Sequence, residues 1–133
     1  MLQLSEAEAD KRQTRLLALV EALPEATARG DPHLSLEVRR KRFGWLLRDH
    51  HGDGRLALHC RAPRSIGREL AHSRSAAYHI PRYVGQHGWV GYWLDLPKID
   101  WDEVRAIVTD AYRATAPKKL LAQMDGAASG KTS

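Results

Sequence analysis

Alternation of apolar and polar side chains between residues 33 and 61 is the feature that most limits how this chain folds. Three runs place an apolar residue at every second position, at 34–38, 43–47 and 56–60. This two-residue period is typical of β-strands, whose successive side chains point to opposite faces of a sheet. The second of the two separating turns contains Asp53-Gly54, a pair that favours a tight hairpin. The sequence therefore predicts a three-stranded antiparallel meander.

Helical periodicity flanks the predicted meander on both sides. Ser5 and Glu8 have the spacing of a capping box, and leucine and valine residues then recur at helical spacing until Pro24. A stripe with the same period follows Asp100, a favourable N-cap residue, and Pro117 suits the first turn of a last helix. Helices are predicted at about 6–22, 63–71, 100–112 and 117–124.

A second pair of strands is predicted between the second and third helices, at 78–83 and 89–94. Pro81 restricts the first of them to the edge of a sheet, because proline has no backbone N–H to donate. Residues 26–32 contain turn-forming residues and are predicted to be a connector. The resulting order, α-βββ-α-ββ-α-α, predicts an α+β fold in which helices cover one face of an antiparallel sheet.

Length and composition exclude several classes of protein. The 133 residues suit one domain, which we expect to span residues 1–125 with a disordered tail at 126–133. No uncharged apolar run approaches the roughly 18 to 20 residues of a membrane helix, and the acidic start lacks a signal-peptide pattern. The single cysteine, Cys60, has no partner for an internal disulfide and is expected to lie in the core. We therefore expect a cytoplasmic protein, with a monomer favoured.

Positive charge is concentrated in the middle of the chain. The whole sequence has 21 Lys and Arg residues against 16 Asp and Glu, but from residue 39 to residue 87 eleven bases face three acids. Such a block is typical of a polyanion-binding surface, and an ordinary solvated basic face has the same composition. The candidates for phosphate contacts are Arg39, Arg40, Lys41, Arg42, Arg48, Arg55, Arg61, Arg64, Arg68, Arg74 and Arg82.

Aromatic and histidine side chains are the other candidates for ligand binding. The residues expected to pack in the core are Phe43, Trp45, Tyr92 and Trp101. Trp89 and Trp93 share one face of their predicted strand, opposite to the face of Val90, Tyr92 and Leu94. They are therefore candidates to line a groove. His50 and His51 are expected to diverge as strand neighbours, which disfavours a metal site with Asp53. We predict no catalytic residues, no metal and no cofactor.

Several motifs together resemble those of the MmcQ/YjbR family. They are Leu23-Pro24-Glu25-Ala26, Gly88-Trp89-Val90-Gly91-Tyr92-Trp93-Leu94-Asp95, Asp100-Trp101, Asp110-Ala111-Tyr112 and Ala116-Pro117-Lys118-Lys119-Leu120. The resemblance covers about residues 5–124 and implies a CyaY-like α+β fold, similar to the double-wing DNA-binding domain of a phage transcription factor. The family carries no established catalytic residues. Ala111 stands where many relatives have serine, so no role of that serine applies here.

Charge and resemblance together lead to the principal hypothesis, a small non-enzymatic protein that holds duplex DNA through arginine–phosphate contacts. The hairpin turns are the expected wings, and the turn 39–42 presents four of the cations. The alternative hypothesis is a non-enzymatic module that binds a protein or a small ligand in a cleft near Trp89 and Trp93. The two hypotheses differ in whether the cations converge on one side of the folded domain.

Overall fold

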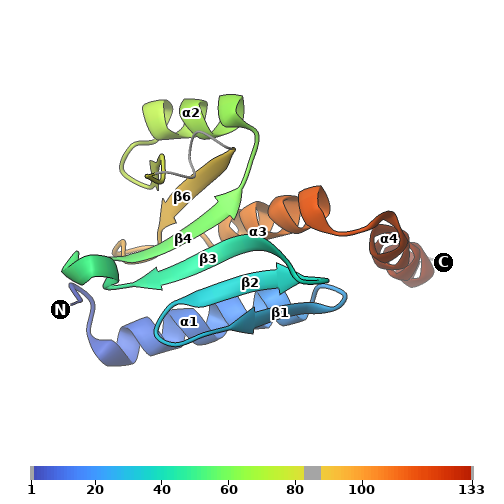
Figure 1. Ribbon diagram of the computed structural model, residues 1–133, viewed down its shortest axis with the longest axis horizontal. Helices are drawn as coiled ribbons and strands as arrows, with labels where there is room; N and C mark the ends of the chain where they lie inside the picture. The colour runs from blue at the N-terminus through green and yellow to red at the C-terminus, as the bar shows by residue number, and fades with distance from the viewer. Residues whose placement is uncertain (1, 83–87, 133) are drawn as a thin grey trace.

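Six antiparallel strands form one sheet in the computed structural model, which describes residues 2–82 and 88–132 (Figure 1). The strands are β1 (Ala26–Arg29), β2 (Leu34–Val38), β3 (Lys41–Arg48), β4 (Leu56–Arg61), β5 (Tyr78–His79) and β6 (Trp89–Trp93). The helices are α1 (Glu6–Glu21), α2 (Arg64–Ser73), α3 (Trp101–Thr115) and α4 (Lys118–Thr132), with a short 3-10 helix η1 (His50–Gly52). The strand order is β1-β2-β3-β4-β6-β5. The predicted α+β fold class is confirmed.

The capping residues start the two long helices where the sequence predicts them. The hydroxyl of Ser5 accepts a hydrogen bond from the N–H of Glu8 at 3.1 Å. The carboxylate of Asp100 accepts from the N–H groups of Asp102 and Glu103 at 3.1 and 3.2 Å. The last helix, α4, is longer than predicted and continues through residues 126–132, for which the sequence predicts a disordered tail. Once a first turn exists, adding residues to a helix costs little.

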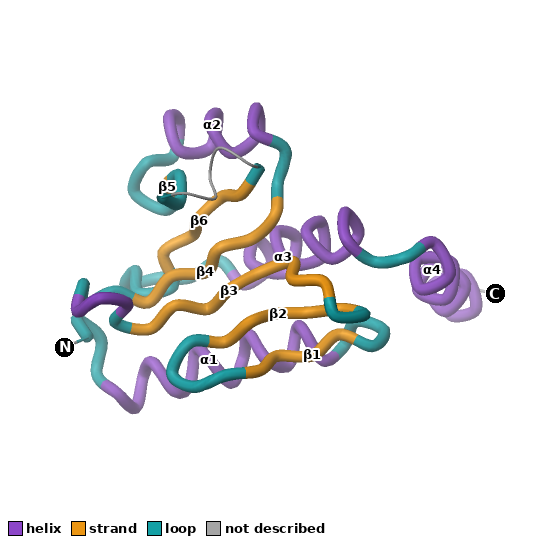
Figure 2. Tube along the Cα trace, in the orientation of Figure 1, coloured by secondary structure: helices purple, strands orange, loops and turns teal. Residues whose placement is uncertain are grey.

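Strand β1 corrects the prediction that residues 26–32 are only a connector. Ala26 and Ala28 lie opposite Val38 and Leu36 of β2, so the meander has four strands instead of three. The run of alanine, threonine and arginine has weak strand propensity, and its pairing depends on the neighbouring strand. Figure 2 shows β1 beside β2 and in front of α1, which packs against it.

The second predicted hairpin joins the same sheet. Strand β6 pairs with β4 on one side and with β5 on the other, so β5 is an edge strand, as Pro81 indicates. Strand β5 contains Tyr78 and His79 alone, shorter than the predicted 78–83. Proline at position 81 ends the ladder because it offers no donor. Residues 83–87, which include His87 and most of the predicted turn, lie outside the described part of the chain.

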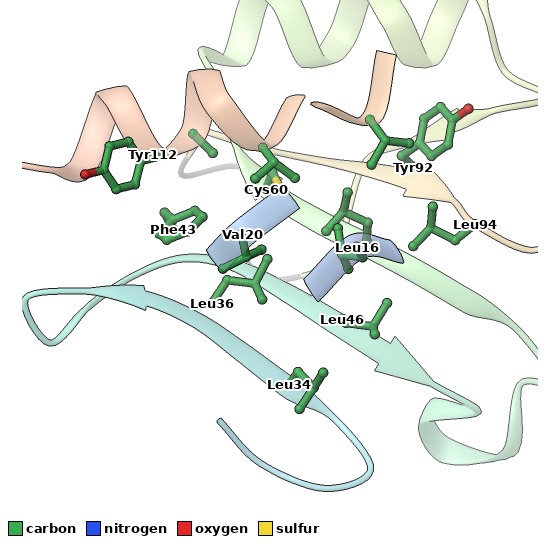
Figure 3. Packing of buried hydrophobic residues seen from close by; sticks show 14 of the residues in the cluster. Leu16, Val20, Leu34, Leu36, Phe43, Leu46, Cys60, Tyr92, Leu94 and Tyr112 are labelled. Atoms are coloured by element: carbon green, nitrogen blue, oxygen red, sulfur yellow. The ribbon is translucent and has the colours of Figure 1, made fainter. Parts of the chain in front are cut away.

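The hydrophobic core lies between one face of the sheet and helices α1 and α3. Figure 3 shows Leu36, Leu46 and Cys60 of the sheet against Leu16 and Val20 of α1. All five side chains are fully buried, which confirms the core assignment of Cys60. Burial also raises the pKa of this thiol. Helix α2 packs on the same side of β6, so within residues 2–82 and 88–132 no helix covers the opposite face of the sheet.

A β-bulge at Phe43 changes which side chains of β3 face the core. Leu36 lies opposite Gly44, but the next residue of β2, Glu37, lies opposite Arg42, so Phe43 is an extra residue in β3. Phe43 turns toward the helices and meets the ring of Tyr112 edge to face, with centroids 5.8 Å apart.

The same bulge corrects the predicted alternation of the run 43–47. Leu46 is buried in the core, whereas Trp45, expected to pack there with Phe43, lies on the face without helices. A shift of one residue moves every later side chain of a strand to the other face. The core positions of Phe43 and Tyr92 are confirmed, and Trp101 packs at the margin of the core.

Arg12 is a buried cation that ties α1 to the segment between β6 and α3. One guanidinium nitrogen, Nη1, donates to the carbonyl oxygens of Leu94 and Leu96, both at 2.6 Å. Nε donates to the carboxylate of Glu8 at 3.2 Å. Arg12 is 9% exposed, so these groups have little access to water. The sequence pattern of α1 does not distinguish this arginine from its solvent-exposed neighbours.

We predict that Arg12→Met destabilises the protein by about 3 kcal/mol, because it leaves buried carbonyl oxygens without a donor. The matched control is Arg15→Met on the same helix, whose exposed guanidinium lies 4.7 Å from the ring centroid of Trp101. This control is expected to cost less than about 1 kcal/mol. Urea unfolding of both variants measures the difference, and equal losses would contradict the structural role of Arg12.

Candidate functional site

Four of the eleven predicted phosphate-binding residues are held by carboxylates. Arg39 makes two hydrogen bonds with Glu25, at 2.6 and 2.8 Å. Arg48 pairs with two acidic residues of α1: its guanidinium nitrogens lie 2.5 Å from a carboxylate oxygen of Glu6 and 2.7 Å from one of Asp10. Arg55 makes two hydrogen bonds with Asp95, at 2.7 and 2.9 Å, and Arg74 pairs with Glu103 of α3. The positive charge of these four side chains is therefore largely compensated.

A second group of cations has no carboxylate partner within residues 2–82 and 88–132 and gathers at one end of the sheet. We call this group the basic end, and its members are Arg40, Lys41, Arg42, Arg61 and Arg64. The start of β3 lies beside the end of β4, because Gly44 pairs with Cys60, and α2 begins three residues beyond β4. Neighbouring strands are about 4.8 Å apart, so the start of β3 and the end of β4 lie side by side at this end of the sheet. In Figure 1 the start of β3 and the end of β4 are the right-hand ends of these strands, and α2 lies above β4 and β6.

The remaining predicted residues lie around this group. Arg68 is exposed one turn further along α2, and Arg82 is exposed between β5 and the segment outside the described residues. Lys119 of α4 lies near Glu25 and, after Arg39, helps to lower the pKa of that carboxyl group. Lys119 is not among the predicted phosphate contacts, because it lies far from the central basic segment in the chain.

The hairpin turn that carries Arg39 and Arg40 has an unfavourable backbone conformation. Val38 pairs with Lys41, so these two arginines are the whole loop of a two-residue hairpin. Their φ angles are +50° and +67°, a region that asparagine and glycine prefer. Strain of this kind is concentrated at functional sites, where side-chain chemistry matters more than backbone preference.

On the face of the sheet without helices, arginine and histidine side chains cover the tryptophan rings. The guanidinium of Arg42 lies 3.8 Å from the ring centroid of Trp45. Arg55 lies 3.7 Å and the ring of His79 lies 3.9 Å from the ring centroid of Trp93. Two groups this close to one centroid occupy opposite sides of the ring. Both faces of the Trp93 ring are therefore covered, which leaves no ring face on which a nucleic-acid base stacks.

His59 and His79 meet above Gly91 on this face. Their Nε2 atoms are 3.0 Å apart, although the two residues lie on strands that β6 separates. Glycine at position 91 leaves room for the ring of His79, because a Cβ there would lie 2.1 Å from Nε2 of His79 and would force that ring to move. Burial, and then the neighbouring His79, lower the pKa of His59 to about 4. Burial, and then the charge of Arg55, lower the pKa of His79 to about 4.

A groove of about 580 Å³ lies on the opposite side of the sheet, between α2 and α3. Val90 and Gly88 line it, whereas Trp89 and Trp93 do not. The groove borders β6, the strand near which the cleft is predicted. The alternation of the strand, however, puts the two tryptophans on the other face of the sheet. Trp89 itself is 9% exposed.

The turn after β3 does not have the predicted strand geometry. His50 and His51 lie in η1, where their ring centroids are 4.0 Å apart, instead of pointing to opposite faces. Among the residues that the structure describes, no group of three or more His, Cys, Asp or Glu side chains is placed to hold a metal ion.

Comparison with known proteins identifies the family. A family model described as YjbR matches residues 17–114, from the middle of α1 to the last turn of α3. The chain belongs to the YjbR family. The resemblance inferred from the sequence motifs is thereby confirmed.

The YjbR-family chain also resembles a solved structure, the crystal structure of the Deinococcus radiodurans protein DR2400 with the domain DUF419. The TM-score is 0.60 and the identity 17%, over 73% of this chain and 72% of that chain. At this identity the likeness shows a shared fold alone. No match is found among the curated proteins. In the described ranges of the chain, no helix has both the length and the apolar character needed to cross a membrane.

We predict that the YjbR-family protein loses stability as the pH falls from about 6.5 to about 4. His59 and His79 have pKa values in the folded state below the ordinary value of histidine, so the unfolded chain takes up protons first. Their contribution to stability is complete above about pH 7 and is lost as the pH falls through this range, on the order of 2 kcal/mol for the pair.

The measurement is urea unfolding at about pH 7.5 and about pH 5, compared with the double variant His59→Gln/His79→Gln. The double variant is expected to lose less stability between the two pH values than the natural protein does. His72→Gln, which removes an exposed histidine of α2, is the control and retains the full loss. The same pH dependence in the double variant would show that the histidine pair is not responsible.

Proposed function

We propose that this YjbR-family protein binds duplex DNA through phosphate contacts at its basic end, in the cytoplasm and without catalysing a reaction. The observation that carries the proposal is the placement of the five cations of the basic end, on the turn before β3, the start of β3, the end of β4 and the start of α2, at one end of the sheet. None of them has a carboxylate partner in the described ranges, so their charge is not compensated there, although Nε of Arg42 donates to the hydroxyl of Ser35 at 2.8 Å. Clustered cations without counter-charges are the electrostatic pattern of a DNA-binding surface.

The strained turn at Arg39 and Arg40 supports the same proposal. A two-residue turn of this type is more stable with asparagine and glycine. The chain instead has two arginines with positive φ, of which Arg39 is anchored to Glu25 and Arg40 is left exposed. Anchoring the first arginine holds the second at the tip of the hairpin, which corresponds to a wing of the fold that the family resemblance implies.

The contacts are expected to be largely independent of DNA sequence. Phosphate contacts position a protein on the duplex, whereas base edges carry the sequence information. Four of the five cations of the basic end lie on a turn and on strand ends, and Arg64 lies at the first position of a helix. A monomer is sufficient for this mode of binding.

We predict that DNA affinity falls steeply with salt. If all five cations contact phosphates, the logarithm of the association constant falls with a slope of about −4.5 against the logarithm of the salt concentration. Fluorescence anisotropy of a labelled duplex, titrated at about 50 mM and about 200 mM salt, measures this slope. Affinity that does not change with salt, or no binding at either concentration, would contradict the proposal.

The charge-reversal variant Arg40→Glu/Lys41→Glu tests the location. It is expected to weaken binding by more than about tenfold for every duplex tested and to reduce the salt slope by about 1.8. The matched control is Lys98→Glu/Arg105→Glu, which makes the same change in net charge with exposed residues beside and on the first turns of α3. Equal losses in the two variants would mean that net charge alone, and not the basic end, determines binding.

We also predict that Arg40→Gly makes the protein more stable and a weaker DNA binder. Glycine relieves the positive φ of +67°, which raises the free energy of unfolding by about 0.5 to 1 kcal/mol. Removing one phosphate contact lowers the affinity several-fold. The control is His51→Gly, which relieves a φ of +55° at a site outside the basic end and leaves DNA affinity unchanged. Urea unfolding and anisotropy on the same samples give both quantities.

A further inference from the structure

The groove between α2 and α3 has the size of a small-molecule site. Its volume is about 580 Å³, and small-ligand sites commonly occupy about 300 to 1,000 Å³. The end of β4 and the start of β6 form its floor, and one helix forms each wall. The groove lies on the helix side of the sheet, so it is separate from the face on which Trp45 and Trp93 lie.

Apolar side chains line most of this groove. Ile66 and Leu70 come from α2, Ile107 from α3 and Val90 from β6. Ile66 is 49% exposed, the most exposed large apolar side chain among the described residues. Leaving such a side chain in water forgoes the favourable burial that an apolar ligand would supply.

The groove is bordered by charges of both signs. Arg61 and Arg64 lie at the end of β4 and the start of α2, without a carboxylate partner in the described part of the chain. Asp110 of α3 lies on the other wall. The first turn of α2 follows Pro63, whose side chain cannot accept its free N–H groups, so the positive end of the helix adds to the arginines. The α2 wall therefore favours an anion.

We propose that this groove binds a small organic anion with an apolar body, in which a carboxylate or phosphate group meets Arg61 and Arg64 and an aliphatic part lies against Ile66 and Val90. The arginine fork accepts either oxyanion through two parallel hydrogen bonds. This ligand class differs from DNA, and the proposal does not depend on the proposed function. Arg61 and Arg64 belong to both sites, so a bound anion competes with phosphates for two of the five cations.

The test is isothermal titration calorimetry with three probes of one chain length: decanoate, decanol and decylammonium, each below its micellar concentration. Decanoate is expected to bind most tightly and decylammonium least tightly, because two cations outnumber the single acid at the groove. Decylammonium binding as tightly as decanoate, or no binding of decanoate in the millimolar range, would overturn the proposal.

Two matched variants show where the probe binds. Ile66→Gln is expected to lower decanoate affinity about tenfold, since it replaces the apolar wall with an amide. Ile80→Gln is the control, because Ile80 is similarly exposed at 42% but does not line the groove, and it changes the affinity less than twofold. Ala114→Trp fills the groove from an exposed position on α3 and abolishes binding. Unchanged decanoate affinity in both Ile66→Gln and Ala114→Trp would overturn the proposal.

The ligand proposal and the DNA proposal fail separately. Ile66→Gln weakens decanoate binding and leaves DNA affinity unchanged, whereas Arg40→Glu/Lys41→Glu weakens DNA binding and leaves decanoate affinity within about twofold. Asp110→Asn distinguishes the head groups, because it raises decanoate affinity several-fold and lowers that of decylammonium. The opposite response to Asp110→Asn would assign the site to a cationic ligand.

Discussion

In the described part of the chain helices cover one face of the sheet and leave the other uncovered, which is the main constraint on this structure. The side chains of β2, β3, β4 and β6 that point toward α1 and α3 form the core, and those that point away must remain stable in contact with water. On that second face, arginine side chains lie on the two tryptophan rings, Arg42 on Trp45 and Arg55 on Trp93. A guanidinium covers apolar ring surface while its N–H groups stay hydrated or bonded, so the face is stable without a further layer.

The bulge at Phe43 and the hairpin before it determine which side chains near the start of β3 face the core and which face outward, where the proposed DNA contacts lie. The bulge turns Phe43 into the core and leaves Arg42 on the outer face, next to a turn that carries two arginines with positive φ. Anchoring of Arg39 by Glu25 offsets part of the strain in this turn. The arrangement lowers stability locally and concentrates positive charge, which is the compromise expected where surface chemistry is selected over backbone preference.

Ion pairing divides the arginine and lysine side chains of the central basic segment into two groups with different roles. Arg48, Arg55 and Arg74 are next to carboxylates from distant parts of the chain and stabilise contacts between elements. The cations of the basic end have no carboxylate partner in the described part of the chain and can meet a ligand. Two of them, Arg61 and Arg64, also border the groove between α2 and α3. An anion in the groove and a phosphate backbone at the basic end would therefore meet at the same pair of arginines.

Local patterns in the sequence were enough to predict the meander, the caps of α1 and α3, the edge position of β5 and the family. Each depends on residues a few positions apart, whose spacing alone decides the period or the cap. The pairing of β1, the place of β6 between β4 and β5, the contact of His59 with His79 and the division of the arginines were decided only by the tertiary structure. These features join residues that are distant in the chain, and their partners are brought together by strand register and burial, which no local spacing encodes.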